Sequence, residues 1–292
     1  MKDDTSLLDS SLKAIKLFQK ECEIPHQGEV NRARYMPQQY NVIATKTING
    51  EVHIFDYHKQ SNKPELKLLG HDSEGYGLSW NPQRKGYLVS GSEDSNICMW
   101  DIEIATELNL TMECIARYEA HVGPVHDVAW HRMYPHLFGS VGADHKILLW
   151  DIREGKTKPA QTVLGHTNEV LSIDFNPINE FLMATASADH SVGVWDLRNL
   201  QIKQCSLEKH KNEVLIVMWS PNNETVLATA GQDRKILIWD LANTPGKELK
   251  FTHEGHMSKI NDIGWNGNEN MFMASTSDDN ILEIWQVSNK LF

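Results

Sequence analysis

The sequence predicts an all-β protein built as a β-propeller with six blades, and three observations lead to this fold class. A histidine recurs six times, and an aromatic residue follows each one 29 positions later. These aromatic residues lie 44 to 50 positions apart, and β-rich runs such as Ile236–Trp239 lead into them. Pairs such as Asn81-Pro82 mark turns between the strands. Short strands at a period of roughly 40–50 residues are typical of a propeller.

Two further positions keep the same spacing in every repeat. A serine or threonine follows the histidine by 19 positions, and an aspartate or asparagine follows it by 23. Buried polar groups need partners, so we expect a hydrogen-bonded tetrad in each blade, running from aspartate to histidine to hydroxyl to indole N–H. The five complete tetrads are His71, Ser90, Asp94 and Trp100; His121, Ser140, Asp144 and Trp150; His166, Thr185, Asp189 and Trp195; His210, Thr229, Asp233 and Trp239; and His256, Ser275, Asp279 and Trp285.

The first repeat is expected to be the weakest, because Asn49 and Phe55 stand where the other repeats have aspartate and tryptophan. The constant spacing assigns six of the 14 histidines to a structural role instead of catalysis or metal binding. No phosphate-binding loop, nucleophile–base pair or paired-carboxylate motif occurs. We therefore predict a protein with no enzymatic activity, no cofactor, no metal site and no small-molecule substrate.

A propeller must protect its edge strands by closing the ring. The stretch Phe18–Ile24 alternates apolar and polar residues, and we expect it to be the outer strand of the last blade, whose inner strands end at Trp285. This divides the chain into an N-terminal arm with the closing strand, residues 1–25, and a propeller, residues 26–292. The longest link between blades is expected at Glu103–Tyr118.

The composition narrows the choice of partners and compartment. The formal net charge of -11 disfavours direct binding to nucleic acid and suits a basic partner. The 4 cysteines form no CxxC pair, so they predict no zinc site and fit a reducing compartment. The acidic start is unlike a signal peptide, and no apolar run reaches the roughly 18 residues of a membrane span. We expect a soluble intracellular protein without membrane contact.

The repeats resemble those of WD40 proteins, and several runs resemble one family in particular. The matching runs are Gly28–Pro37, Glu74–Pro82, Leu137–Val141, Val194–Leu200 and Asp279–Ile281. They are similar to the histone-binding WD40 family, which includes the retinoblastoma-binding proteins and the small subunit of chromatin assembly factor 1. The resemblance implies a non-enzymatic chaperone and scaffold for histones H3 and H4. It also implies membership of chromatin assembly, remodelling, deacetylase or methyltransferase complexes, and a nuclear location, with a cytoplasmic pool also compatible.

The chain departs from that family in two places. The family has seven blades and a long N-terminal helix, whereas only 25 residues precede His26 here, so we expect one blade and that helix to be missing. The family's long acidic loop before its last repeat corresponds to the short link Leu241–Lys250. In the family, the helix and the loop hold a histone H4 helix. The departures therefore predict weak binding of histone H4, or none.

The residues that follow each histidine are expected to lie at the mouth of the central channel. Three positions after the histidine, four of the six repeats have glutamate. Carboxylates recurring at one structural position predict a site for a basic, histone H3-like peptide, and Tyr76 can stack on an arginine or lysine. The predicted peptide-binding residues are Glu29, Asn31, Arg32, Glu74, Tyr76, His126, Glu169 and Glu213. The positions that match the family are Glu29, Asn31, Arg32, Glu74, Tyr76 and Glu213. The family has an acid where His126 stands and an amide where Leu171 stands, so these two places are expected to contact the peptide differently.

Other functions remain open on the sequence. The runs Trp150–Arg153 and Trp195–Arg198 resemble the WDxR box with which substrate receptors of cullin-type ubiquitin ligases bind their adaptor. Related acidic propellers act as ribosome-assembly chaperones, which gives a third candidate function. For a propeller enzyme, the fourth candidate, the sequence offers no residues.

Overall fold

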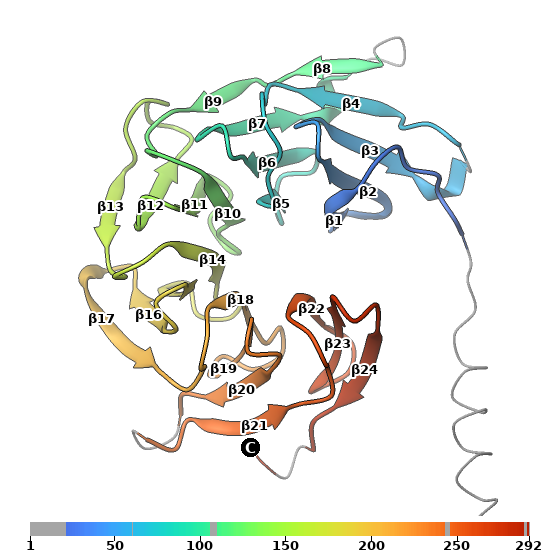
Figure 1. The fold of residues 1–292 in the computed structure, drawn as a ribbon. Helices are drawn as coiled ribbons and strands as arrows, with labels where there is room; N and C mark the ends of the chain where they lie inside the picture. Colours follow the sequence, from blue (N-terminus) through green and yellow to red (C-terminus); the bar gives the residue numbers. More distant parts are fainter. Residues whose placement is uncertain (1–21, 60, 106–109, 243–245, 289–290, 292) are drawn as a thin grey trace, which may run out of the picture.

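The computed structural model describes residues 22–59, 61–105, 110–242, 246–288 and 291. Six β-sheets stand around a central channel, and each sheet is one blade of a propeller (Figure 1). The prediction of an all-β propeller with six blades is confirmed. The only helices among the described residues are two short 3-10 turns, η1 (Tyr57–Lys59) and η2 (Ile102–Ile104). No helix in this part of the chain is long and apolar enough to span a membrane.

The first two blades contain nine strands. Blade 1 consists of β1 (Val30–Met36), β2 (Gln39–Thr47), β3 (Val52–Asp56), β4 (Leu66–Leu69) and β8 (Thr111–Glu113). Blade 2 consists of β5 (Leu78–Trp80), β6 (Tyr87–Gly91), β7 (Ile97–Asp101) and β9 (Ala116–Tyr118). The predicted link between blades therefore contains structure of its own. Its strand β8 pairs in parallel with β4, with Lys67 opposite Thr111, and adds a fifth strand to the edge of blade 1.

The other four blades follow the repeats closely. Blade 3 consists of β10 (Val125–Trp130), β11 (Leu137–Gly142), β12 (Lys146–Asp151) and β13 (Gln161–Leu164). Blade 4 consists of β14 (Val170–Phe175), β15 (Leu182–Ser187), β16 (Val192–Asp196) and β17 (Asn199–Leu207). Blade 5 consists of β18 (Val214–Trp219), β19 (Val226–Gly231), β20 (Ile236–Asp240) and β21 (Leu249–His253). Blade 6 consists of β22 (Ile260–Trp265), β23 (Phe272–Ser277) and β24 (Leu282–Gln286).

The hairpin between the second and third strands explains why the aspartate spacing is fixed. The residue that follows the tetrad aspartate has a positive φ in blades 2 to 6, at Ser95, His145, His190, Arg234 and Asn280, and Gly50 occupies the same place in blade 1. The aspartate stabilises this left-handed turn by accepting backbone N–H groups. In blade 3, for example, Asp144 accepts from the N–H of Lys146 at 3.2 Å. The tetrad aspartate thus both stabilises the turn and contacts the histidine, which fixes its place in the repeat.

The hydrophobic core lies between neighbouring blades. Val89 and Ile97 of blade 2 belong to the same buried cluster as Val128 and Phe138 of blade 3, and similar clusters join the blades that follow. The middle strands are therefore buried on both faces and read as continuous apolar runs. Each of blades 2 to 5 is packed against another blade on both sides, whereas no buried apolar cluster of described residues joins blade 6 to blade 1.

The proposed closing strand is not seen where the sequence analysis placed it. Residues 18–21 lie outside the described residues, while Cys22–Ile24 are described and form no strand. They line a pocket with Phe55 and Tyr57 of blade 1 instead of pairing with β24. These residues lie beside blade 1 because the chain continues directly to His26, whose ring is 5.8 Å from the ring of Phe55 in that blade. Among the described residues, blade 6 therefore has three strands, and β24 is its outer edge.

Blades 6 and 1 are joined by charged side chains. Arg34 of β1 donates to both carboxylate oxygens of Asp262 in β22, at 2.7 and 3.2 Å, and Arg32 donates to the same carboxylate at 3.3 Å. Between described residues, these are the hydrogen bonds that cross from blade 6 to blade 1. The ribbons of the two blades diverge toward the outside of the ring (Figure 1). We refer to this contact as the Asp262 bridge.

Replacing Asp262 tests how much the Asp262 bridge contributes to stability. We expect Asp262→Asn to lower the free energy of unfolding by about 1–2 kcal/mol, because two partly buried guanidinium groups lose their anion. Urea unfolding measures this loss. The control is Asp278→Asn, which removes an exposed carboxylate paired with Lys259 at 3.4 Å. Equal losses for the two variants would show that the bridge carries no special share of the stability.

Candidate functional site

The tetrads are complete in blades 3, 4 and 5. In each of these blades the histidine contacts the aspartate at 2.9 or 3.0 Å and the hydroxyl oxygen at 2.8 Å. The tryptophan indole donates to that same hydroxyl at 2.8 or 2.9 Å. The hydroxyl residues Ser140, Thr185 and Thr229 are fully buried. The tetrad therefore satisfies polar groups inside the blade and leaves no side chain of the set available to a substrate.

Asp189 shows how strongly a tetrad holds its charge. Burial opposes ionisation, but bonds from His166, from the Ser191 hydroxyl and from the Thr167 backbone N–H hold the pKa of Asp189 well below its usual range. Burial also lowers the pKa of His166, which favours the neutral ring. This arrangement stabilises a neutral histidine beside a carboxylate.

Blades 1, 2 and 6 depart from the tetrad pattern. In blade 1, His26 contacts Thr45 at 3.1 Å, while Asn49 is exposed, in agreement with the weak first repeat. In blade 6, His256 contacts Ser275 at 2.8 Å, but its Nδ1 stays 3.4 Å from Asp279 and has no hydrogen-bond partner. These two blades are the neighbours of the Asp262 bridge, where the packing of the ring is incomplete.

The tetrad predicted for blade 2 is wrong in its inner half. His71 contacts Asp94 at 3.0 Å as expected, but its Nε2 faces the Ser90 carbonyl and not the hydroxyl. The indole of Trp100 donates to the carbonyl of Leu69 at 3.1 Å. The reason is Lys46 of blade 1, whose ammonium reaches into blade 2 and donates to the Ser90 hydroxyl.

Lys46 is a residue that the sequence analysis missed. Its side chain is 0% exposed, and this burial lowers its pKa to about 7. A signal for it was present, since the residue 20 positions after the histidine is lysine only in the first repeat. The other repeats have Gly91, Val141, Ala186, Ala230 and Thr276 at this position. The lysine is thus a charge placed at a site built for small or apolar side chains.

The channel mouth brings the repeats together at a second position. A cavity of about 560 Å³ is lined by the residue five positions after each of the six histidines. These residues are Asn31, Tyr76, His126, Leu171, Leu215 and Asn261. We refer to this cavity as the mouth cavity. Tyr76 and Asn261 are exposed, so the mouth cavity is open to a ligand from solution.

The predicted carboxylates are placed differently from one another. Of the four glutamates, only Glu29 lines the mouth cavity. Two others are held by a residue of the preceding blade: Asn31 donates to Glu74 at 2.8 Å, and His126 contacts Glu169 at 2.9 Å. One of the four predicted glutamates thus lies on the cavity wall, while neighbouring blades use two others for contacts of their own. Glu29 and Glu213 form no side-chain hydrogen bond or ion pair with another described residue.

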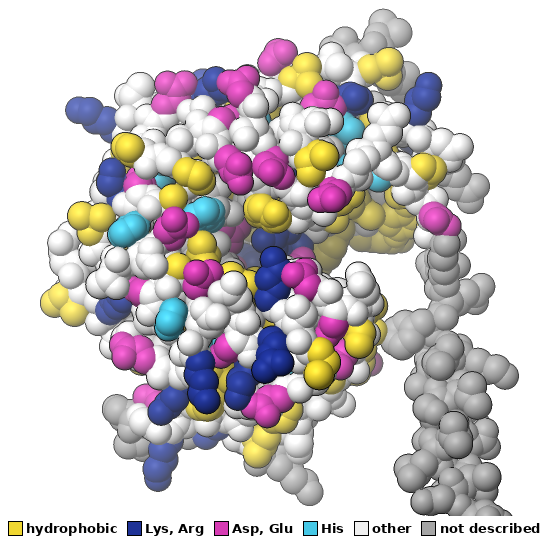
Figure 2. All heavy atoms as spheres, viewed as in Figure 1, with side chains coloured by type: hydrophobic (Ala, Val, Ile, Leu, Met, Phe, Trp, Pro, Cys, Tyr) yellow, Lys and Arg dark blue, Asp and Glu magenta, His cyan; other side chains and the backbone are white. Residues whose placement is uncertain are grey.

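Arg32 has a structural position within the mouth cavity. It lines the cavity, but its guanidinium donates to the Tyr76 carbonyl at 3.2 Å and to the Asp262 carboxylate. The sixth repeat contributes Lys259, which brings a positive charge to the rim. In the view down the channel, acidic side chains stand on several sides of the opening, while lysine and arginine gather over blades 5 and 6 (Figure 2). The carboxylates that line the mouth cavity are Glu29 on blade 1 and Asp278 on blade 6, and Lys259 lies beside the latter.

The family model of the WD domain, G-beta repeat, matches five segments of the chain. They are residues 62–101, 112–151, 157–196, 202–240 and 247–286, which together make up more than half of the sequence. The chain belongs to the WD40 repeat family. Each match ends at the last residue of a repeat, the acid or amide after the tryptophan. The first repeat, which ends at Asp56, lies outside the matched segments, as its missing aspartate and tryptophan would suggest.

WD40 propellers generally act as non-catalytic scaffolds for protein–protein interactions, and the geometry described above fits that role. The histidines and aspartates that could suggest catalysis are bonded inside blades 2 to 5. The two WDxR arginines are engaged locally, since Arg153 binds Asp151 and Arg198 binds Asp196 through paired hydrogen bonds of 2.5 to 3.1 Å. In this WD40 propeller, the mouth cavity remains as the place where side chains from all six blades meet, polar ones from blades 1, 2, 3 and 6 and apolar ones from blades 4 and 5.

Proposed function

We propose that this WD40 propeller is a non-enzymatic scaffold that binds a basic, histone H3-like peptide at the mouth cavity. The observation that supports this most directly is the meeting of residues from all six repeats at one open cavity, with the Glu29 carboxylate on its wall. Glu74 and Glu169 stand on blades 2 and 4, two residues before the lining residues Tyr76 and Leu171. The net charge of -11 favours the approach of a basic chain.

The cavity suggests how such a peptide is bound. An arginine or lysine side chain can place its charge beside Glu29 and its aliphatic part against Leu171 and Leu215. The exposed ring of Tyr76 offers a face for a cation. Lys259 on blade 6 repels a second basic residue, so we expect the peptide to lie away from that blade. An extended peptide loses conformational freedom on binding, which keeps the affinity modest.

Carboxylate replacements test this proposal. We expect Glu29→Gln to weaken binding of a labelled histone H3 N-terminal peptide by up to about fivefold, because an exposed charge pair contributes up to about 1 kcal/mol. Glu74→Gln should weaken it less, since an amide can still accept the bond from Asn31. Tyr76→Ala should affect a peptide with a central arginine more than one with alanine there. Fluorescence anisotropy measures these affinities, and salt should weaken all of them.

The control is Glu154→Gln, which removes an exposed carboxylate from the turn after β12, away from the mouth cavity. It should leave peptide binding unchanged, and none of the variants should shift the melting temperature. If the Glu29 and Glu74 variants bind the peptide as tightly as the parent, the mouth cavity is not the site.

The wider identity of the partner is tested by affinity purification with mass spectrometry. Recovery of histones with deacetylase, methyltransferase or chromatin assembly subunits is the expected result, and it would place the protein in the nucleus. Recovery of a cullin-ligase adaptor, or of ribosomal proteins, would favour the two alternative functions. A pull-down with a histone H4 helix is expected to be negative.

A further inference from the structure

Blade 6 carries an ionisable pair at two positions where blades 2 to 5 carry apolar residues; blade 1 also has ionisable residues there, Glu23 and His53. The positions concerned are three residues before and 27 residues after the repeat histidine. In the second to fifth repeats they are buried or half-buried and hold Leu68 and Cys98, Tyr118 and Leu148, Val163 and Gly193, and Leu207 and Leu237. In the sixth repeat they hold His253 and Glu283. Packing does not explain this exchange, because ionisable groups are costly at a site that apolar residues fill.

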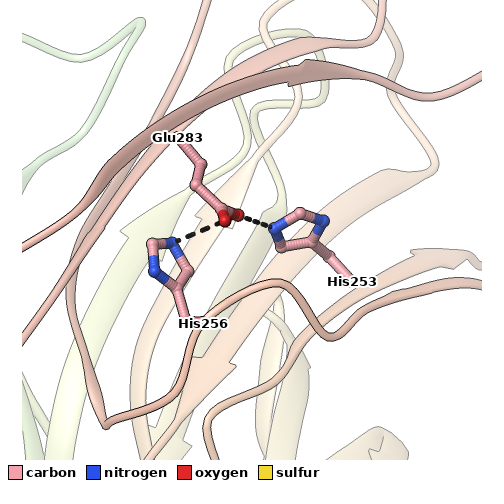
Figure 3. Close-up of side chains that lie close together, drawn as sticks. All are labelled: His253, His256 and Glu283. Atoms are coloured by element: carbon pink, nitrogen blue, oxygen red, sulfur yellow. Dashed lines mark hydrogen bonds and ion pairs between the residues drawn. The ribbon is translucent and has the colours of Figure 1, made fainter. Parts of the chain in front are cut away.

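The two residues meet a third at the inner side of β24. Glu283 points between the rings of His253, from β21, and His256, from the loop after it (Figure 3). Its Oε2 lies 2.5 Å from His253 Nε2 and 3.8 Å from His256 Nε2. One ligand atom from each of the three side chains lies within 4.8 Å of the others. His253 is 16% exposed and Glu283 26%, whereas His256 is fully buried.

We propose that His253, His256 and Glu283 bind a zinc ion. Two imidazole nitrogens and one carboxylate oxygen are a ligand set that Zn²⁺ prefers over the hard cations Ca²⁺ and Mg²⁺. Ligand atoms around a tetrahedral zinc are roughly 3.3 Å apart, given bond lengths near 2.0–2.1 Å. The two distances from Glu283 bracket this value, so a small rotation of its carboxylate brings it into range. Water supplies the fourth ligand on the exposed side.

The unpartnered nitrogen of His256 is a second, independent observation. Its Nδ1 is buried without a hydrogen bond, 3.4 Å from Asp279 Oδ2, although the complete tetrads hold this contact at 2.9 to 3.0 Å. A metal on Nε2 fixes the proton on Nδ1 and directs it at Asp279, as in the carboxylate–histidine–zinc arrangement. His256 then gives up its contact with Ser275, whose oxygen still accepts the Trp285 indole.

A zinc ion here would link two blades. His253 belongs to β21, the outer strand of blade 5, whereas Glu283 belongs to β24, the edge of blade 6. The ring of His253 is already oriented by stacking on Trp285, with ring centres 4.3 Å apart and an angle of 4° between the planes. The metal would fasten the last blade, which has three strands among the described residues, to its neighbour. For His256, this revises the expectation that the repeated histidines bind no metal.

The proposal is tested by titrating the metal-free, full-length protein with Zn²⁺ in a calorimeter, and with Co²⁺ in an absorption spectrometer. We expect one saturable site, an intense visible Co²⁺ band typical of low coordination number, and a higher melting temperature with Zn²⁺. Glu283→Gln keeps the size of the side chain and should weaken binding at least about tenfold. Asp279→Asn should weaken it about tenfold through His256.

Two controls keep the test decisive. Glu283→Leu restores the residue found at this position in blades 3 and 5, so it should fold and lose the metal site. Glu254→Gln changes an exposed neighbouring carboxylate that pairs with Lys235, and it should bind zinc like the parent. The absence of a saturable site in the parent, or unchanged affinity in Glu283→Gln, would overturn the proposal. Neither result bears on peptide binding at the mouth cavity.

Discussion

Asp189→Ala is expected to lower the free energy of unfolding of the propeller by about 1–3 kcal/mol. We expect a loss near the upper end of this range, because several hydrogen bonds are lost together. The substitution removes an acceptor that bonds His166 at 2.9 Å, the Ser191 hydroxyl at 2.6 Å and two backbone N–H groups. The buried histidine and the turn both lose their partner. Urea unfolding followed by tryptophan fluorescence measures the change.

The matched control for this variant is Asn49→Ala, at the same repeat position in blade 1. Asn49 is exposed and no bond joins it to His26, so the loss should stay within about 0.5 kcal/mol. The pKa of Asp189 is lowered in the folded state, so its contribution is present above the unfolded value near 3.9 and is lost as the pH falls through the folded value. The difference between parent and Asp189→Ala should therefore shrink in acid. Equal losses at Asn49 and Asp189 would contradict the role of the tetrad.

Lys46→Met is expected to stabilise the protein by about 1–4 kcal/mol at pH 7, the range found when buried charged groups are replaced by well-packed apolar ones. The lysine is fully buried, and the ammonium is bonded to the Ser90 hydroxyl alone among side chains. Methionine has a similar length and needs no partner. The Ser90 hydroxyl then becomes available to His71 and Trp100, as the equivalent hydroxyls are in blades 3, 4 and 5.

The pH dependence gives this prediction a second, independent measurement. Burial lowers the pKa of Lys46 to about 7 in the folded protein, whereas an unfolded lysine titrates near 10.4. Between these values the unfolded chain binds more protons, so the stability of the parent rises with pH across this window. Lys46→Met should remove that rise, and the exposed Lys85→Met should keep it. A parent whose stability does not change from pH 7 to 9.5 would contradict the burial of an ionisable lysine.

The repeat spacing predicted the blades well because it reports on contacts within one blade. The histidine, hydroxyl, aspartate and tryptophan belong to one repeat, so their spacing along the chain determines which of these side chains contact one another. The turn after Asp144, with His145 in a left-handed conformation, is an example of such local control. The channel mouth was predicted for the same reason, since one position per repeat, such as Tyr76, must point toward the axis.

The contacts that the sequence did not predict lie between blades. Lys46 enters the neighbouring blade and displaces the tetrad of His71, and Asn31 reaches across to Glu74. His253 of blade 5 meets Glu283 of blade 6 in the same way. Such contacts depend on how one blade is positioned against its neighbour. The spacing within a single repeat carries no information about this position. Lys46 could still be noticed, because no other repeat has a charged residue at its place in the repeat.

The Asp262 bridge also determines how the molecule responds to force and to salt. In a propeller whose first and last blades are joined by backbone hydrogen bonds, the contacts between neighbouring blades are all of similar stability. Here the described contact between the first and last blades depends on one carboxylate and two guanidinium groups, so the ring is held together at this place by ion pairs between side chains. The contacts of the bridge are 2.7 to 3.3 Å long and partly buried, so salt at physiological strength, with a screening length of about 8 Å, weakens them little. Breathing of the whole molecule should begin at this one contact and proceed blade by blade, as unzipping does in a linear array.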